Sequence, residues 1–536
     1  MKTHYSFIIL FLSFISLGFA QNSYHLDINN IDAEIRPSSV LFTPDSNYVP
    51  GFLCPKSENA STIYASALWM GGIDANGVLH LAADKFGAEQ EYSLGPVPID
   101  SATSFAQYDV VFPITKMEVD SFLLYHQCLS DPSCNSSVSF PSYTLPNHIV
   151  NWPAHGDLSV GQDYLLAPFV DVNNDGTYDP TLGDYPCFKG DEAVFFVLND
   201  STLTHASGGA KIGAEIQVLA YSFYADTTSA LYSTLFVNYT VINKSILDYV
   251  DFKMGIYSDF DIGYAQSDYV GTYIDENTVF GYNATPNDVG GANAVGTLIP
   301  AQSVTFLNHN LSNSMYFTTF NGSFGHDPIN ASQYYNYMSS IWLDNTPLTY
   351  GGTGHGGSLS TDYMFPEVTP VGSPIWTEMS AGNSVSDRRA VGNISFPTFN
   401  SGDTIVMDIA YVWARTAPDT LTNGVAKLQL EVQEVKQFYD SLITSCHNSD
   451  VVSVLEQDGQ ISYEVFPNPV SDQVSFYLET PTSSTIHIYN TSGALVKYIE
   501  SNLQKIELDL SALTAGLFLY TVQTENGIAS GKIIKD

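Results

Sequence analysis

The residues best suited to hold a metal ion lie between Asp171 and Asp179, where the chain reads Asp-Val-Asn-Asn-Asp-Gly-Thr-Tyr-Asp. Oxygen-bearing side chains stand at the first, third, fifth and ninth positions, and a glycine at the sixth position allows a tight turn. This is the spacing with which a loop surrounds a calcium ion. The seventh residue would add its backbone carbonyl, and Asp184 could be a late ligand. The predicted calcium ligands are Asp171, Asn173, Asp175, Thr177, Asp179 and Asp184.

This loop departs from an EF-hand in two respects. Its twelfth position is Leu182 in place of the bidentate glutamate, and no helical pattern flanks it. It is more similar to the single-ion loops of dockerin or thrombospondin type repeats. The alternative is that a cluster of Asp, Asn and Gly simply forms turns. The spacing favours calcium in a structural role, because an ion held by side chains rarely leaves room for a substrate.

A second acidic group is formed by Asp259 and Asp261, with Asp268 following seven residues after Asp261. Side chains two apart on a strand face the same side of the sheet, so the first two carboxylates could share a cation. They could equally be solubilising residues at a strand end. Both interpretations stay open at this point.

Two further sets of residues are candidates for other chemistry. His155 and Asp157 could form a dyad, but no hydrolase or metalloprotease motif completes it. In a chain with only four arginines, the run from Asp387 to Arg389 favours a buried ion pair over an anion-binding site. Paired carboxylates for glycoside hydrolysis would be spaced in the fold and not in the sequence, so the sequence leaves them open.

The overall charge restricts the classes of partner. The 536 residues include 56 acidic and 18 basic side chains, for a formal net charge of −38. A protein with such a charge repels nucleic acid and anionic membranes, so neither is an expected partner. An apolar content of 44% and an aromatic content of 13% are sufficient to fill an ordered core.

Residues 1–20 have the organisation of a secretory signal peptide. Lys2 is followed by the apolar run 7–17, and Gly18-Phe19-Ala20 supplies small residues before a cleavage point. No other stretch has the length of a membrane span, so we expect the mature protein to have none. In an oxidising compartment, Cys128 and Cys134 could close a short disulfide loop, and Cys54 and Cys187 could pair at long range.

The elements that position these side chains are predicted to be mainly strands. Asn76-Gly77 between apolar runs indicates a hairpin. Alternating or continuous apolar segments with short turns indicate antiparallel strands within 193–198, 216–223, 231–242, 252–257 and 404–413. Residues 117–126 indicate a short helix, 283–362 long loops, and 425–442 an amphipathic helix. We therefore expect a mostly β cargo domain at 21–445, a large antiparallel sandwich-like fold with long loops and one C-terminal helix.

A polar linker at 446–462 precedes a distinct module at 463–536. Its short strands alternate apolar and polar residues between turns, which predicts a small, Ig-like antiparallel sandwich. The segments 466–469, 493–496, 513–518 and 532–535 resemble, in order, the type A C-terminal sorting domain of Bacteroidetes type IX secretion. The resemblance implies that the type IX machinery recognises 463–536 and exports the protein through the periplasm to the cell surface or the medium.

A second resemblance covers most of residues 60–440. It rests on six short motifs at 67–72, 152–157, 183–186, 268–271, 387–389 and 412–415. These are similar to motifs in an uncharacterised family of large exported Bacteroidetes proteins. That family implies a β architecture and supplies no reaction.

Together these features predict an exported, cell-surface or secreted protein whose cargo is a calcium-stabilised binding or surface-structural module. An extracellular glycan or another cell-surface molecule would be its partner. The alternative function is that of a secreted polysaccharide-degrading enzyme, a hydrolase or a lyase.

Overall fold

The computed structural model describes residues 22–44, 50–58, 60–98, 107–290, 294–319, 324–366, 376–416, 423–442, 463–468, 470–478, 483–489, 495–513, 516–524 and 527–535. The predicted signal peptide at 1–20 and linker at 446–462 lie outside these residues. The chain divides into two compact units, Met1–Cys446 and His447–Asp536. Each unit is mostly β, as the sequence predicts.

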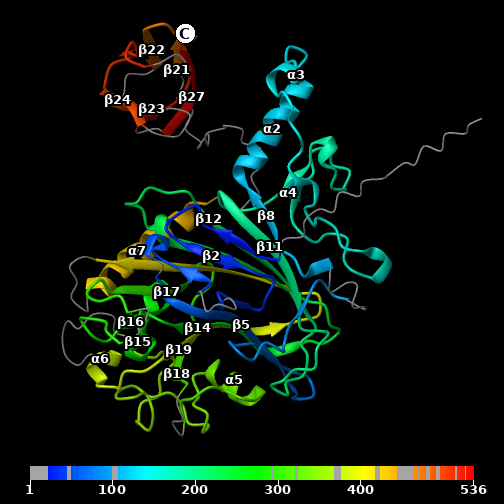
Figure 1. Ribbon diagram of the computed structural model, residues 1–536, viewed down its shortest axis with the longest axis vertical. Helices are drawn as coiled ribbons and strands as arrows, with labels where there is room; N and C mark the ends of the chain where they lie inside the picture. Colours follow the sequence, from blue (N-terminus) through cyan, green and yellow to red (C-terminus); the bar gives the residue numbers. More distant parts are fainter. Residues whose placement is uncertain are drawn as a thin grey trace, which may run out of the picture. The chain divides into compact units, whose positions relative to one another are not determined.

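The larger sheet of the first unit has nine antiparallel strands (Figure 1). Along the sheet they are β15 (Asp268–Tyr273), β16 (Thr278–Asn283), β17 (Pro300–Phe306), β20 (Thr404–Arg415), β13 (Thr234–Asn243), β12 (Ala214–Ser222), β11 (Glu192–Asn199) and β7 (Ser93–Leu94), with β8 (Phe112–Thr115) also paired to β11.

The second sheet has six strands. They are β18 (Asn313–Thr318), β19 (Arg388–Phe399), β14 (Tyr249–Phe260), β5 (Ile63–Asp74) and β3 (Val40–Leu41), with β6 (Leu79–Ala83) paired to β5. The predicted hairpin is confirmed, because β5 and β6 pair around Gly77, whose φ of 78° suits the tight turn. A small sheet of β1 (Tyr24–Leu26), β2 (Asp32–Ile35) and β4 (Phe52–Leu53) completes this part of the unit.

The core lies on both faces of the nine-stranded sheet. On one face, alternate β11 residues such as Val194 and Phe196 join a cluster that includes Trp69 of the six-stranded sheet. On the other face, Phe195 belongs to a cluster that includes Val432 of the predicted C-terminal helix, α7 (Asn423–Ser441). Every residue of β11 is therefore buried, which explains its continuous apolar run.

The expectation that 283–362 forms only loops is wrong. This segment contains β17 within the large sheet, β18 at the edge of the other sheet, and a helix, α5 (Ala331–Tyr337). The sequence of β17 conceals the strand, because Gln302, Ser303 and Thr305 are polar although all are buried. Their side chains form hydrogen bonds inside the sandwich, for example from the Thr62 hydroxyl to Gln302 Oε1 at 2.7 Å.

A mixed segment between β8 and β11 covers part of the outer face of the large sheet. It contains α2 (Lys116–Ser130), α3 (Ser136–Ser139), α4 (Asn147–Val150), β9 (Phe169–Val170) and β10 (Tyr185–Pro186), and Figure 1 shows α2 and α3 projecting from the sheets. A capping box between Thr115 and Glu118 starts α2. The predicted disulfide between Cys128 and Cys134 is confirmed at the other end of this helix.

The remaining cysteines do not follow the expected long-range pairing. Cys54 is a free, buried thiol, whereas Cys187 is disulfide-bonded, so these two residues are not joined. Cys446 lies outside the described residues. Sequence spacing could identify the local disulfide but could not show which distant cysteines meet.

The second unit consists of two small antiparallel sheets. One holds β21 (Tyr463–Phe466), β22 (Gln473–Leu478) and β25 (Lys505–Asp509), and the other holds β24 (Leu495–Ser501), β23 (Ser484–Tyr489), β26 (Gly516–Thr524) and β27 (Gly527–Lys535). Val474, Phe476 and Ile486 are among the residues of its common core. The small sandwich predicted from alternating apolarity is confirmed. In the part of the chain that the structure describes, no helix is both long and apolar enough to cross a membrane.

Candidate metal centres

The predicted calcium loop lies between β9 and β10 and folds around its first residue. The Asp171 carboxylate accepts hydrogen bonds from the backbone amides of Asp175, at 3.3 Å, and Gly176, at 2.7 Å. Asn174 and Gly176 have positive φ angles of 59° and 79°, which bring the chain back on itself. The carboxylate at position one therefore lies inside the turn made by positions five and six.

The middle of the loop carries three more predicted ligands, Asn173, Asp175 and Thr177. The Asn173 side-chain oxygen accepts from the Asp175 amide at 3.1 Å, and Asp175 Oδ1 accepts from the Thr177 amide at 2.8 Å. Asn173 Nδ2 also donates to Asp175 Oδ2 at 2.9 Å. All three side chains are exposed, so the loop is open to solvent.

Asp179 and Asp184 have defined roles at the end of the loop. The buried Asp184 carboxylate accepts from the amides of Val172 and Asp179, both at 2.9 Å, and thereby joins the two ends of the loop. Asp179 Oδ1 caps the short 3₁₀ helix Pro180–Leu182 through the amide and hydroxyl of Thr181, and these hydrogen bonds lower the pKa of Asp179. Calcium binding by these residues stays a prediction.

His155 anchors the same loop through its ring nitrogens and does not pair with Asp157. Its Nε2 accepts from the Tyr178 amide at 2.8 Å, so its Nδ1 is the nitrogen that donates to the Tyr164 carbonyl at 3.0 Å. Asp157 instead caps a 3₁₀ helix through the amide of Ser159 at 2.8 Å. The two residues that could have formed a dyad therefore hold separate local structures.

A second candidate centre joins the two adjacent strands β14 and β19. Asp259, Asp261 and Asp387 each offer a carboxylate oxygen, and these oxygens lie within 4.8 Å of one another, the single such group of three found among the described residues. The sequence identifies Asp259 and Asp261 as a pair but not Asp387. Only the register of the two strands, which places Asp259 opposite Arg389, could have shown that Asp387 lies beside them.

Arg389 compensates part of this negative charge. Its Nε lies 3.0 Å from Asp259 Oδ2, and its Nη1 contacts Asp327 at 2.6 Å, while Lys85 approaches Asp327 at 2.9 Å. Burial raises the pKa of Asp261 to about 7, with repulsion from Asp387 as the next cause. Burial also raises the pKa of Asp259 well above its ordinary value, although Arg389 opposes that shift.

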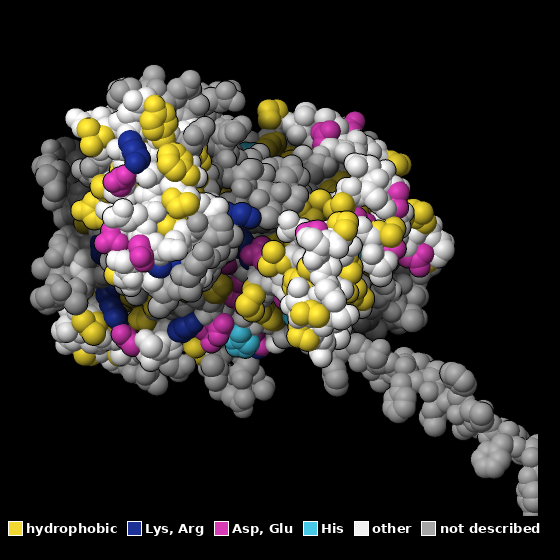
Figure 2. Space-filling model, turned by 90° about the horizontal axis from the view of Figure 1, so that it is seen from above, with side chains coloured by type: hydrophobic (Ala, Val, Ile, Leu, Met, Phe, Trp, Pro, Cys, Tyr) yellow, Lys and Arg dark blue, Asp and Glu magenta, His cyan; other side chains and the backbone are white. Residues whose placement is uncertain are grey.

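The preceding residue, Arg388, confirms the prediction of a buried ion pair. Its guanidinium lies 2.8 Å from Glu378 of α6 (Glu378–Ala381), and both side chains are almost fully buried. All four arginines of the chain are in ion pairs, with Arg36 bound to Glu34 and Arg415 bound to Glu58. Figure 2 shows Asp and Glu side chains scattered over the visible face and not gathered in one large patch.

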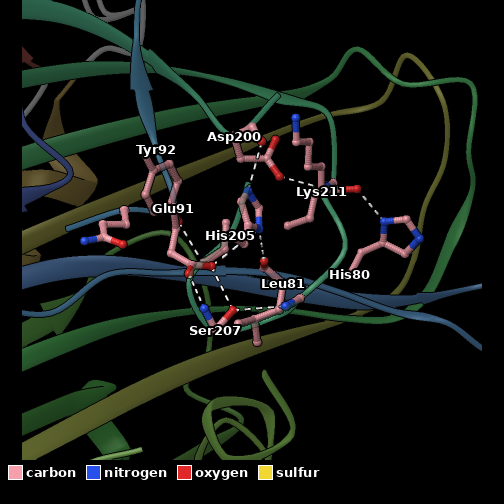
Figure 3. A network of polar contacts seen from close by, with 12 residues as sticks. His80, Leu81, Glu91, Tyr92, Asp200, His205, Ser207 and Lys211 are labelled. Carbon is pink, nitrogen blue, oxygen red and sulfur yellow. Dashed lines mark hydrogen bonds and ion pairs between the residues drawn. The ribbon is translucent and has the colours of Figure 1, made fainter. Parts of the chain in front are cut away.

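A polar network that sequence reasoning missed lies where β6 meets the loop between β11 and β12 (Figure 3). The two ring nitrogens of His205 face the carbonyls of Leu81 and Asp200 at 2.6 and 3.0 Å. Glu91 Oε2 lies 3.4 Å from His205 Nδ1, on the side of the Leu81 carbonyl. Ser207 donates to Glu91 from its amide and its hydroxyl. The network joins the hairpin to the large sheet and has a structural role.

One surface cavity of about 540 Å³ lies beside the end of α7. Two of its lining side chains, Asn308 and His309, already donate to the Val406 carbonyl at 2.9 and 2.8 Å. Lys436 is likewise engaged with Glu276 at 3.1 Å. Because these polar groups are occupied within the protein, the cavity does not indicate a particular ligand.

Comparison with known proteins identifies the second unit. Residues 464–536 match the family described as "Secretion system C-terminal sorting domain". No curated protein matches the chain. Among solved structures, a polysaccharide lyase is similar over 70% of this chain and 37% of its own length, with 9% identity and a TM-score of 0.21. A similarity at this level supports no inference about the activity of the cargo.

Proposed function

We propose that the cargo of this protein is a calcium-stabilised binding or surface-structural module. Because residues 464–536 are a type IX secretion sorting domain, the protein is exported and is either secreted or attached to the cell surface. The sorting domain implies contact with the secretion machinery. The cargo would meet its partner, an extracellular glycan or another cell-surface molecule, outside the cell.

The observation that carries the calcium proposal is the fold of the Asp171 loop. Two backbone amides converge on the carboxylate at position one, and the side-chain oxygens at positions three and five lie in the same turn. Acidic and amide oxygens gathered in one loop repel each other unless a cation lies between them, and calcium accepts six to eight oxygen ligands.

The place of the loop supports a structural role for the ion. Tyr178 follows the loop glycine by two residues, packs against the outer-face core, and donates its hydroxyl to the Ile149 carbonyl at 2.6 Å. Asp184 holds the other end of the loop and precedes β10. An ion bound in the loop would therefore stabilise the segment that covers the large sheet.

A binding or structural role is also supported by two residues whose types could have served other chemistry and which instead hold the fold together. His155 uses both ring nitrogens to hold backbone groups, and Arg388 is enclosed with Glu378. These side chains maintain the fold and are not available to a substrate.

Thermal unfolding of the full chain tests the calcium proposal. Calcium at a hundredfold excess over a Kd of about 10⁻⁴ M should add about 2.7 kcal/mol relative to a chelator. Asp175→Ala should remove most of this gain, whereas Asp109→Ala, at an exposed carboxylate outside both acidic clusters, should retain it. Magnesium at the same concentration controls for charge screening. An unchanged wild-type melting temperature would exclude the site.

The binding proposal is tested by incubating the purified protein with a panel of extracellular polysaccharides. Retention of the intact protein on one of them, without release of reducing or unsaturated ends, supports a binding module. Turnover of any of these polymers would instead make the cargo an enzyme.

A further inference from the structure

The second acidic group is built on the ends of two paired strands. Asp259 lies near the end of β14 and Asp261 directly follows that strand, while Asp387 directly precedes β19. The antiparallel register sets Asp259 opposite Arg389. Because side chains two apart share a face, Asp261 and Asp387 extend the same face beyond the last paired residues.

Two carboxylate oxygens at this position have no hydrogen-bond partner among the residues that the structure describes. Asp259 is 2% exposed, and its Oδ2 forms an ion pair with Arg389 Nε at 3.0 Å and accepts from the Tyr257 hydroxyl at 3.4 Å, whereas its Oδ1 has no partner there. Asp387 Oδ1 is the second such atom and is also buried. A buried carboxylate oxygen left unpaired is costly, so these atoms indicate a missing positive group.

The charges around the group do not balance. Asp259, Asp261 and Asp387 lie close to Asp327 and to the fully buried Asp268, whose Oδ1 also has no partner within the described part of the chain. The cationic side chains that face these five carboxylates are Arg389 and Lys85. A divalent cation would offset the excess of carboxylates over cationic side chains.

We propose that Asp259, Asp261 and Asp387 bind one calcium ion, at a site separate from the Asp171 loop. Ligand oxygens at about 2.4 Å from a calcium ion can be up to about 4.8 Å apart, and the three oxygens lie within 4.8 Å of one another. Magnesium dehydrates reluctantly and usually keeps several waters, so a site made of protein carboxylates favours calcium. The free Oδ1 of Asp259 is the oxygen this residue would contribute.

The ion would strengthen the junction between the two sheets of the cargo. Asp261 and Asp387 adjoin the ends of β14 and β19 of the six-stranded sheet, while Asp268 begins β15 of the nine-stranded sheet and bridges to Ser386. Asp268 Oδ2 accepts from the Ile262 amide at 3.0 Å, so this side chain also holds the turn that follows β14. Calcium would thus bind where segments of both sheets meet.

The test compares the full wild-type chain with Asp261→Asn, which keeps the shape of the side chain but removes its charge. In a chelator this variant should melt at a higher temperature than wild type, because repulsion is relieved. In millimolar calcium it should melt at a lower temperature, because the ion loses a ligand. Equilibrium dialysis should show one calcium ion fewer per chain, and magnesium should stabilise wild type less than calcium does.

The substitution Asp261→Asn is also made in an Asp175→Asn background, which distinguishes calcium binding at this site from calcium binding in the Asp171 loop. Loss of one ion on changing Asp261 in both backgrounds supports the proposal even if the loop binds no calcium. An equal ion count in wild type and Asp261→Asn, or a difference in melting temperature that calcium does not alter, overturns it. Asp387→Asn, at a side chain 15% exposed, provides a second variant with the same expected outcomes if Asp261→Asn does not fold.

Discussion

Replacing Arg388 by methionine should destabilise the cargo more than most single substitutions would. The Arg388 side chain is 5% exposed and its partner Glu378 is fully buried, with Nε of the guanidinium 2.8 Å from Glu378 Oε1. The Val270 amide donates to Glu378 Oε2 at 2.8 Å, and Asn383 Nδ2 donates to Oε1 at 3.1 Å. Methionine retains much of the apolar stem but supplies no charge.

The expected loss of stability comes from the Glu378 carboxylate, which stays buried without its cationic partner. Removing one partner of a buried ion pair costs about 3–5 kcal/mol, because the other charge stays buried without compensation. Burial already raises the pKa of Glu378, and Arg388 opposes that shift. In Arg388→Met the pKa of Glu378 should rise further, so part of the loss should be recovered at low pH, where the carboxyl is protonated.

The assay is urea unfolding of the full chain followed by tryptophan fluorescence. The five tryptophans lie at positions 69, 152, 342, 376 and 413, so this signal reports on the cargo and not on the sorting domain. The double variant Arg388→Met/Glu378→Gln should lose less stability than the sum of the two single variants, by about 2–3 kcal/mol. A loss below about 1 kcal/mol in Arg388→Met, or simple additivity, would refute the reasoning.

Three further predictions concern export, pH and the free thiol. Deleting residues 463–536 should leave a folded cargo in the periplasm, and wild-type levels of the truncated protein at the cell surface would contradict this. Burial raises the pKa of Asp84 to about 6, so the folded state retains a proton that the unfolded chain has lost, and stability should fall by about 3 kcal/mol as the pH rises from about 4 to 6. Asp84→Asn should flatten that part of the profile in urea titrations, because asparagine does not titrate. This variant keeps the contact with Ser39, since the side-chain amide can donate to the hydroxyl that now donates to Asp84. The buried Cys54 should react with a thiol reagent only as fast as the cargo opens, and labelling of the native protein at the rate of a free thiol would be inconsistent with its position.

The features predicted correctly from the sequence depend on nearby residues. Asn76-Gly77 defines a turn whatever the rest of the chain does, and the spacing of apolar residues such as Val425 and Val432 defines α7. Cys134 follows Cys128 by six positions, so their pairing needs no knowledge of the fold. Short motifs and the alternation of apolar and polar residues within each strand predict the sorting module.

The features missed from the sequence depend on distant residues. Asp387 reaches Asp259 only because β14 and β19 pair in one register, and no local pattern encodes that register. The partners of His155 are backbone groups, which carry no side-chain signature. The sequence of β17 does not show an apolar strand pattern, because its buried polar residues form hydrogen bonds with residues elsewhere in the sandwich.

The engagement of every arginine in an ion pair has a consequence for proteolysis. A protease that cleaves after arginine must draw that side chain into its specificity pocket. The side chains of Arg36, Arg388, Arg389 and Arg415 are only 33%, 5%, 11% and 18% exposed, and each is held by a carboxylate. Cleavage at these positions requires the surrounding structure to open first. Outside the cell, the native cargo should therefore survive arginine-specific proteases for as long as it stays folded.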